Sequence, residues 1–113
     1  MLEKISHMVM LKDFYGPLLT DKQQLVLSLY YEEDLSLSEI ADNMNITRQA
    51  VYDLLKRAES ALEDYEKRLQ LVDKFNKNRQ RLNEVYRILD HHQSDAQDIA
   101  RAINILREIT EMV

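Results

Sequence analysis

The 113-residue sequence contains no cysteine, no tryptophan, one glycine and one proline. The lack of cysteine excludes disulfides, thiolate metal sites and a cysteine nucleophile, and it is typical of a reducing cytoplasm. Because glycine and proline form most tight turns, their scarcity argues against a turn-rich β fold. The two residues, Gly16 and Pro17, are adjacent, so long helices are expected on either side of them.

Long apolar runs are also missing. No segment approaches the roughly 18 apolar residues that suggest a membrane span. Glu3, Lys4 and His7 interrupt the apolar residues of the N-terminus, which therefore does not resemble a signal peptide. We expect a soluble, cytoplasmic protein with no membrane partner.

No arrangement typical of an enzyme is recognisable, since there is no phosphate-binding loop, activated nucleophile or set of metal ligands. His91 and His92 are adjacent and have no third ligand nearby, so a helix end explains them better than a metal site. We expect no catalytic residue, no metal, no cofactor and no small-molecule substrate.

The signals that are present predict an all-α fold. Apolar residues at helical spacing predict a first helix over about 2–15, which the glycine and proline end. Thr20 and Gln23 match a capping box that starts a second helix, and the acidic run 32–34 ends it.

The most informative segment is 35–58, LSLSEIADNMNITRQAVYDLLKRA. Ser36 and Glu39 match a capping box, Asn45 suits a tight turn, and Thr47 caps the helix that follows. A core between the two helices is expected from Ile40, Ala41, Ile46, Val51, Leu54 and Leu55. Two short capped helices around a tight turn are typical of a helix-turn-helix, whose second helix enters the major groove of DNA.

The polar side chains of that second helix are the candidate contact residues. Arg48 and Gln49 lie in its first turn, where arginine pairs with guanine and glutamine with adenine. Tyr52 could stack on a base, or it could cover neighbouring apolar surface. The predicted nucleic-acid-binding residues are Ser38, Thr47, Arg48, Gln49, Tyr52, Lys56 and Arg57.

Charge leaves the nature of the partner open. The protein has a net charge of −5, and the three cations within 36–58 are balanced by three anions. Some helix-turn-helix units are structural or bind protein, so direct contact with DNA and its absence both remain possible. Residues 67–81 hold six cations against one anion. Lys74, Lys77, Arg79 and Arg81 form a second candidate site, which is either a solvated helix face or a surface for a polyanion.

Helical signals continue to the C-terminus. They predict a helix over 71–90 and a last helix that starts at a capping box of Ser94 and Gln97. We assign 1–66 to a helix-turn-helix bundle and 67–113 to a two-helix extension. The last helix carries a broad apolar stripe: Ile99, Ala102, Ile103, Leu106, Ile109 and Val113. We expect a homodimer through the C-terminal helices, the alternative being a monomer in which this stripe packs on the bundle.

Three segments carry a resemblance to a known family: DFYGPLLTDKQQ (13–24), YYEEDLSLSEIA (30–41) and TRQAVYDLLKR (47–57). They resemble the YlxM family of small bacterial helix-turn-helix proteins and, more distantly, the fourth region of sigma factors, which reads promoter DNA. The resemblance covers about residues 1–70 and implies a cytoplasmic regulator with no attached reaction. Family members are encoded beside the signal recognition particle protein, which implies a link to that pathway and to its components.

The function predicted from the sequence is therefore nucleic-acid-binding regulation, with DNA as the first candidate ligand and RNA as the second. The alternative is an RNA-associated or protein-binding accessory factor that does not bind DNA sequence-specifically. Asn45 departs from the common helix-turn-helix pattern, in which glycine occupies the turn.

Overall fold

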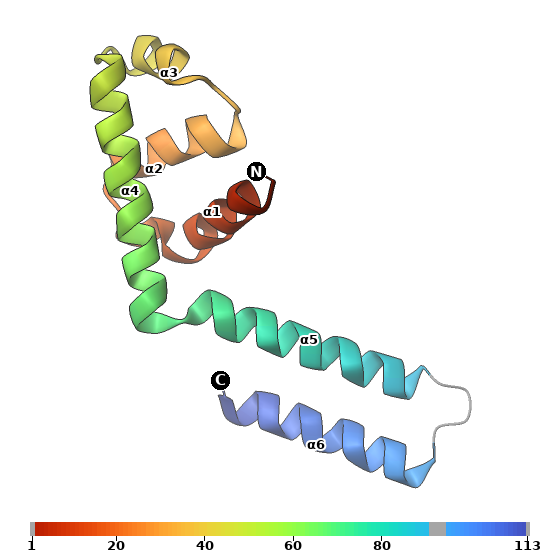
Figure 1. Cartoon of the computed structure of the whole chain (residues 1–113). Helices are drawn as coiled ribbons and strands as arrows, with labels where there is room; N and C mark the ends of the chain where they lie inside the picture. Colours follow the sequence, from red (N-terminus) through yellow and green to blue (C-terminus); the bar gives the residue numbers. More distant parts are fainter. Residues whose placement is uncertain (1, 91–94, 113) are drawn as a thin grey trace. The chain divides into compact units, whose positions relative to one another are not determined.

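The computed structural model describes residues 2–90 and 95–112, and helices make up most of it (Figure 1). In chain order the elements are α1 (Leu2–Tyr15), the 3₁₀ turn η1 (Gly16–Leu18), α2 (Asp21–Leu27), the π-helical turn η2 (Ser28–Glu32), α3 (Leu37–Met44), α4 (Arg48–Leu69), α5 (Leu71–Leu89) and α6 (Ala96–Met112). The described residues contain no strand, so the prediction of an all-α fold is confirmed.

Helix starts follow the capping signals of the sequence. The Thr20 hydroxyl accepts a hydrogen bond from the Gln23 amide at 3.2 Å, and the Gln23 side chain accepts one from the Thr20 amide at 3.1 Å. Such a pair satisfies two amide groups that have no partner within the helix. At α6 the structure differs from the prediction, because the Asp95 carboxylate accepts from the Asp98 amide at 2.9 Å and caps the helix. The predicted cap, Ser94, lies outside the described residues, as do His91 and His92.

The second helix does not continue as a regular α-helix to the acidic run. After Leu27 the chain widens into η2, where the Glu33 amide donates to the Ser28 carbonyl at 3.0 Å. Asp34, two residues after the end of this turn, has a left-handed φ of 56°. A π-helical turn is uncommon and often accompanies a functional or strained position. Here it brings the Tyr31 hydroxyl to a carboxylate of α4.

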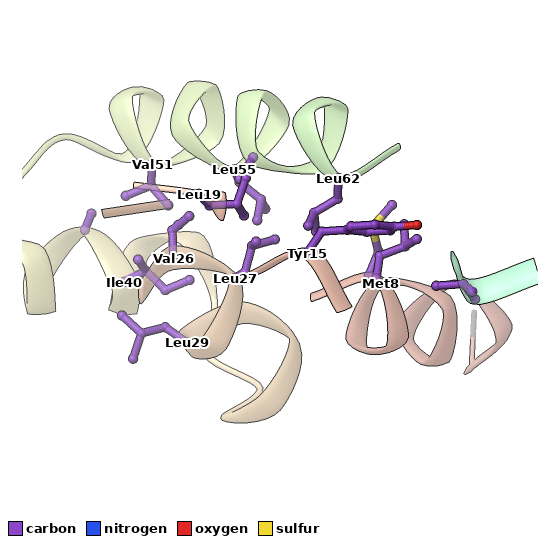
Figure 2. Packing of buried hydrophobic residues seen from close by; sticks show 14 residues of the cluster. Met8, Tyr15, Leu19, Val26, Leu27, Leu29, Ile40, Val51, Leu55 and Leu62 are labelled. Carbon is purple, nitrogen blue, oxygen red and sulfur yellow. The ribbon is translucent and has the colours of Figure 1, made fainter. Parts of the chain in front are cut away.

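The main hydrophobic core lies in the first of two compact units, Met1–Val72. Helix α4 runs along this core and packs against α1, α2 and α3. Figure 2 shows Val51 and Leu55 of α4 facing α2, and Leu62 facing Tyr15 of α1. The largest fully buried side chains are Tyr15, Leu11, Leu27, Ile40, Leu62, Val26 and Val51. Helix α4 is therefore the central support of the helix-turn-helix.

The first unit extends past Glu66, the boundary suggested by the sequence, because a polar network binds the start of α5 to it. The buried Tyr15 hydroxyl donates to Glu66 Oε1 at 2.6 Å and accepts from the Leu71 amide at 3.0 Å. The same carboxylate oxygen accepts from the Val72 amide at 3.0 Å. These bonds cap the first turn of α5, immediately after Gln70 has ended α4 with a left-handed φ of 55°.

The second unit, Asp73–Val113, is an antiparallel hairpin of α5 and α6 (Figure 1). The residues of its core are Val85, Ile88, Ala102 and Ile105, with Ile109 partly buried beside them. Helix α6 therefore uses only part of its apolar stripe to pack on α5. The last predicted stripe residue, Val113, lies outside the described residues.

Candidate nucleic-acid interface

Helices α3 and α4 and the turn between them form the helix-turn-helix. The Ser36 hydroxyl accepts from the Glu39 amide at 3.1 Å and the Glu39 carboxylate accepts from the Ser36 amide at 3.0 Å, which confirms the predicted capping box. Asn45 ends α3 with φ 57° and ψ 45°, the left-handed conformation expected for this turn. The Thr47 hydroxyl accepts from the Ala50 amide at 3.0 Å and starts α4. Local signals alone thus determine where α4 begins.

The N-termini of the two helices differ in charge. The pKa of the Glu39 carboxyl is lowered from its usual value. The main cause is the hydrogen bond from the Ser36 backbone amide, and the Ser36 hydroxyl contributes less. A phosphate that approached α3 would meet this ionised carboxylate. Helix α4 has no acidic residue in its first turn. The free amide groups at its N-terminus are therefore better placed to bind an anion than those of α3.

The core of the motif agrees with the prediction except at one position. Ile40 and Val51 are fully buried, and Leu55 is nearly so. Ile46 is 37% exposed, which differs from the expected core position because the turn leaves its side chain at the edge of the unit. Leu54 is half-buried. The remaining apolar contacts are sufficient to hold α4 against α3, because those side chains exclude water almost completely.

The predicted contact residues of the motif are all exposed: Ser38, Thr47, Arg48, Gln49, Tyr52, Lys56 and Arg57. Helical spacing places Gln49, Tyr52 and Lys56 on one stripe of α4, with Arg48 at one edge and Arg57 at the other. Asp53 lies within the same stripe. We call Arg48, Gln49, Tyr52, Asp53 and Lys56 the reading face.

Two interactions organise the reading face. The Gln49 side-chain amide donates from Nε2 to Asp53 Oδ1 at 3.1 Å. Lys56 Nζ lies 5.5 Å from the centre of the Tyr52 ring and 3.7 Å from Glu59 Oε2. Contacts of this kind at an exposed surface contribute roughly 1 kcal/mol or less, so a bound ligand could replace them. Within the part of the chain that the structure describes, neither Arg48 nor Arg57 has an ion pair.

The sequence did not indicate that Glu59 is buried. Among the residues whose burial the structure describes, it is the only charged one in the core, with 8% of its surface exposed. Its carboxylate accepts from the Tyr31 hydroxyl at 2.6 Å, and Lys4 and Lys56 lie within 4.0 Å of it. Burial, and then the bond to Glu59, raises the pKa of the Tyr31 hydroxyl. Glu59 thus connects α1, η2 and α4, and its ion pair with Lys56 places it beside the C-terminal end of the reading face.

The second predicted site, the basic patch of α5, is divided, because helical spacing places Lys74, Lys77 and Arg81 on one side of the helix and Arg79 on another. Lys77 pairs with Asp73 at 2.9 Å, and Arg81 pairs with Glu108 of α6. Lys74 and Arg79 are exposed, but their positions in the helix place them on different sides. Two of the four cations are therefore partly neutralised within the hairpin.

The described ranges hold neither a cluster of metal ligands nor a membrane-spanning helix. Residues 2–90 and 95–112 contain no group of three or more His, Cys, Asp or Glu side chains that could hold a metal ion. None of the helices in these ranges is both long enough and apolar enough to cross a membrane.

The two capped helices and the left-handed turn between them define a helix-turn-helix protein. Over residues 2–105 the sequence matches a family model described as "Putative helix-turn-helix protein, YlxM / p13 like". A UPF0122 protein of Desulforamulus reducens is 48% identical over 104 residues, which cover 90% of this chain and 89% of that protein. A UPF0122 protein of a Geobacillus strain is 44% identical over 113 residues, which cover 99% of each chain. The chain belongs to the UPF0122 family, as the resemblance to YlxM predicted.

Proposed function

We propose that this protein is a regulator that binds nucleic acid, and DNA first of all, through its helix-turn-helix. The observation that carries the proposal is the N-terminus of α4. This helix end presents Arg48 and Gln49 to solvent, lacks acidic residues in its first turn and is positioned by the Thr47 cap. Helix ends of this kind bind phosphate through their amides while the adjacent side chains reach base edges.

The test removes both base-reading side chains. Duplexes selected by the intact protein from a random pool are compared for binding to the wild type and to the Arg48→Ala, Gln49→Ala double variant. Because a bidentate contact with a base contributes about 1–3 kcal/mol, we expect the double variant to lose at least about tenfold in discrimination between sites. The control, Gln97→Ala with Arg107→Ala, removes the same residue types from exposed positions of α6 and should discriminate as the wild type does. A double variant with unimpaired discrimination would contradict the assignment of the reading face.

A second candidate function is that of an RNA-associated or protein-binding accessory factor. The observation that favours it is the weak positive charge of the reading face, where Asp53 holds Gln49 and Glu59 lies beside Lys56. The signal recognition particle pathway is the setting we propose for either function, because of the resemblance to YlxM proteins. In this case Lys74 and Lys77, which lie on the same side of α5, would contact the RNA.

Salt titration separates these candidates. Binding of duplex DNA and of a structured RNA is measured over a range of salt concentrations, because phosphate contacts release counterions and give a steep dependence. A steep slope for duplex DNA supports the first function. A steep slope for RNA, flattened by Lys74→Glu with Lys77→Glu, supports an RNA-associated factor. If neither duplex DNA nor RNA binds in a salt-dependent way, a protein partner is the remaining candidate.

The proposal includes a cytoplasmic location, no catalytic activity and a second copy of the chain as partner. A two-fold dimer would present two recognition helices, as palindromic operators require.

A further inference from the structure

The reading face of α4 includes one carboxylate, that of Asp53. This side chain is exposed, lies about one helical turn after Gln49 and accepts a hydrogen bond from Gln49 Nε2 at its Oδ1 atom, at 3.1 Å. Arg48 lies on the same face, but the two side chains form no ion pair within residues 2–90 and 95–112. Asp53 therefore keeps its charge on the surface that would face DNA.

A carboxylate at this position is unfavourable for general attraction to DNA. The phosphate groups of a duplex repel it, and it offsets the positive charge that Arg48 and Lys56 bring to the reading face. Its hydrogen bond with Gln49 does not require a charge, because an asparagine side chain would accept the same bond. The acid is therefore better explained by a contact that needs a pure acceptor and rejects other groups.

The acceptor that Asp53 offers fits one kind of group in the major groove. A carboxylate accepts hydrogen bonds at both oxygens and donates none. Oδ1 holds Gln49, and Oδ2 has no hydrogen-bond partner in the part of the chain that the structure describes. In the major groove only the exocyclic amino groups of cytosine and adenine donate, whereas guanine and thymine present acceptors that repel a carboxylate. Adenine also presents its N7 acceptor beside the amino group, which leaves N4 of cytosine as the better match.

The hydrogen bond between the two side chains also leaves Gln49 with a defined set of groups. With one N–H of Nε2 bound to Asp53, Gln49 keeps its second N–H and its Oε1 carbonyl. These two groups match N7 and N6 of adenine, the base that glutamine pairs with through two hydrogen bonds. Because Gln49 and Asp53 are neighbours on one side of the helix, the adenine and the cytosine should lie close together in the target.

We infer that Asp53 determines specificity: it selects a cytosine by accepting a hydrogen bond from the N4 amino group, and it repels bases that present acceptors. The inference rests on the proposed DNA-binding function and states which bases that function recognises. It also accounts for the balanced charge of residues 36–58, because a reading face that rejects incorrect sequences gains selectivity while its general affinity for DNA falls.

The test changes a single amino group of the DNA. Duplexes that the wild type selects from a random pool should share a cytosine close to an adenine. That cytosine is then replaced by N4-methylcytosine, which still pairs with guanine but carries a methyl group in place of the N–H that faces the major groove. This duplex, and one with thymine at the same position, should bind the wild type about tenfold more weakly than the selected duplex.

Two substitutions separate recognition of the base from a general effect of charge. Asp53→Asn keeps the size of the side chain but adds a donor, so it should lose most of the preference for cytosine and bind unselected duplexes more tightly. Asp42→Asn removes the same charge from an exposed position of α3, outside the reading face. This control should keep the preference for cytosine.

The possible failures are distinguishable. A wild type that selects no duplex contradicts the proposed function and overturns the inference with it. A wild type whose selected duplexes share no cytosine, or that binds the methylated duplex as tightly as the unmodified one, overturns the inference alone. The methylated duplex needs no variant, so it decides the question even if Asp53→Asn lowers the helical circular dichroism. If Asp53→Asn keeps the preference, or if both variants lose it equally, the role assigned to Asp53 is wrong.

Discussion

Both units of this chain are built from amphipathic helices, but they differ in how much of the apolar side they bury. In the first unit, fourteen buried residues form one core around α4, and the exposed side of that helix is polar. In the second unit, four buried residues join two helices, and the uncharged apolar side is exposed. The first unit has a large core and can present a polar reading face, whereas the second unit leaves exposed apolar surface, the kind of surface that marks an interaction site.

The largest effect is expected from removing a buried leucine of the first unit. Leu62→Ala should lower the free energy of unfolding by about 2–5 kcal/mol, because it leaves a cavity between α4 and α1. Leu106→Ala removes the same atoms from a residue that is 39% exposed, so the expected loss is smaller. That loss should also depend on protein concentration if Leu106 meets a second copy. Urea denaturation at two protein concentrations measures both effects, and equal losses from the two variants would remove the contrast between the units.

An intermediate effect is expected at the buried carboxylate of the first unit. Tyr31→Phe should lower the free energy of unfolding by about 1–3 kcal/mol, because it leaves Glu59 Oε1 without its donor. The matched control is Tyr30→Phe, since the structure shows no hydrogen bond from the Tyr30 hydroxyl within the described ranges.

The same pair of variants gives a pH test. The pKa of Tyr31 in the folded protein is raised above its ordinary value of 10.0, so the stabilisation is complete below pH 10 and is lost as the pH rises through the folded value. Alkaline destabilisation should therefore be weaker in Tyr31→Phe than in the wild type or in Tyr30→Phe. If the free energy of unfolding falls equally steeply with rising alkaline pH in Tyr31→Phe and in the wild type, the Tyr31 hydroxyl is not hydrogen-bonded to Glu59.

The smallest effects are expected from the helix caps, one in each unit. Ser36→Ala should cost about 1 kcal/mol in the unfolding of the first unit, because the capping box of α3 is lost. Asp95→Ala should cost about as much in the second unit, because Asp95 caps α6. Hydrogen exchange of the two helices measures each loss separately. Protection that is unchanged in α3 would show that Ser36 does not cap it.

The parts of the fold that could be predicted from the sequence are those that depend on neighbouring residues. The capping boxes at Thr20 and Ser36 connect residues three apart, so the residue types alone are sufficient to indicate them. The same holds for the left-handed turn at Asn45 and for the Thr47 cap. Because these local signals lie within the motif, the helix-turn-helix and the exposure of its polar side chains followed from them.

The parts that could not be predicted depend on residues that are distant in the chain. The hydrogen bond between Tyr31 and Glu59 joins residues 28 positions apart, and that between Tyr15 and Leu71 joins residues 56 positions apart. No local sequence pattern can predict bonds over such separations. Glu59 lies among several other acidic residues in the second half of α4, so the sequence indicates a solvated position and not the buried one that the structure shows. The π-helical turn after Leu27 is likewise not visible in the spacing of apolar residues, because tertiary packing overrides local helix preference there.

The two phenols that are bound to carboxylates have an optical consequence. The chain has six tyrosines, two phenylalanines and no tryptophan, so tyrosine dominates its fluorescence. In the folded state the hydroxyls of Tyr15 and Tyr31 each donate a hydrogen bond to a carboxylate in the second half of α4, Tyr15 to Glu66 and Tyr31 to Glu59. Hydrogen bonding of an excited phenol to a carboxylate quenches its emission, so unfolding of the first unit should brighten the protein. Replacing either residue with phenylalanine removes one of the two quenched phenols, so the rise in emission on unfolding should be smaller in each variant than in the wild type.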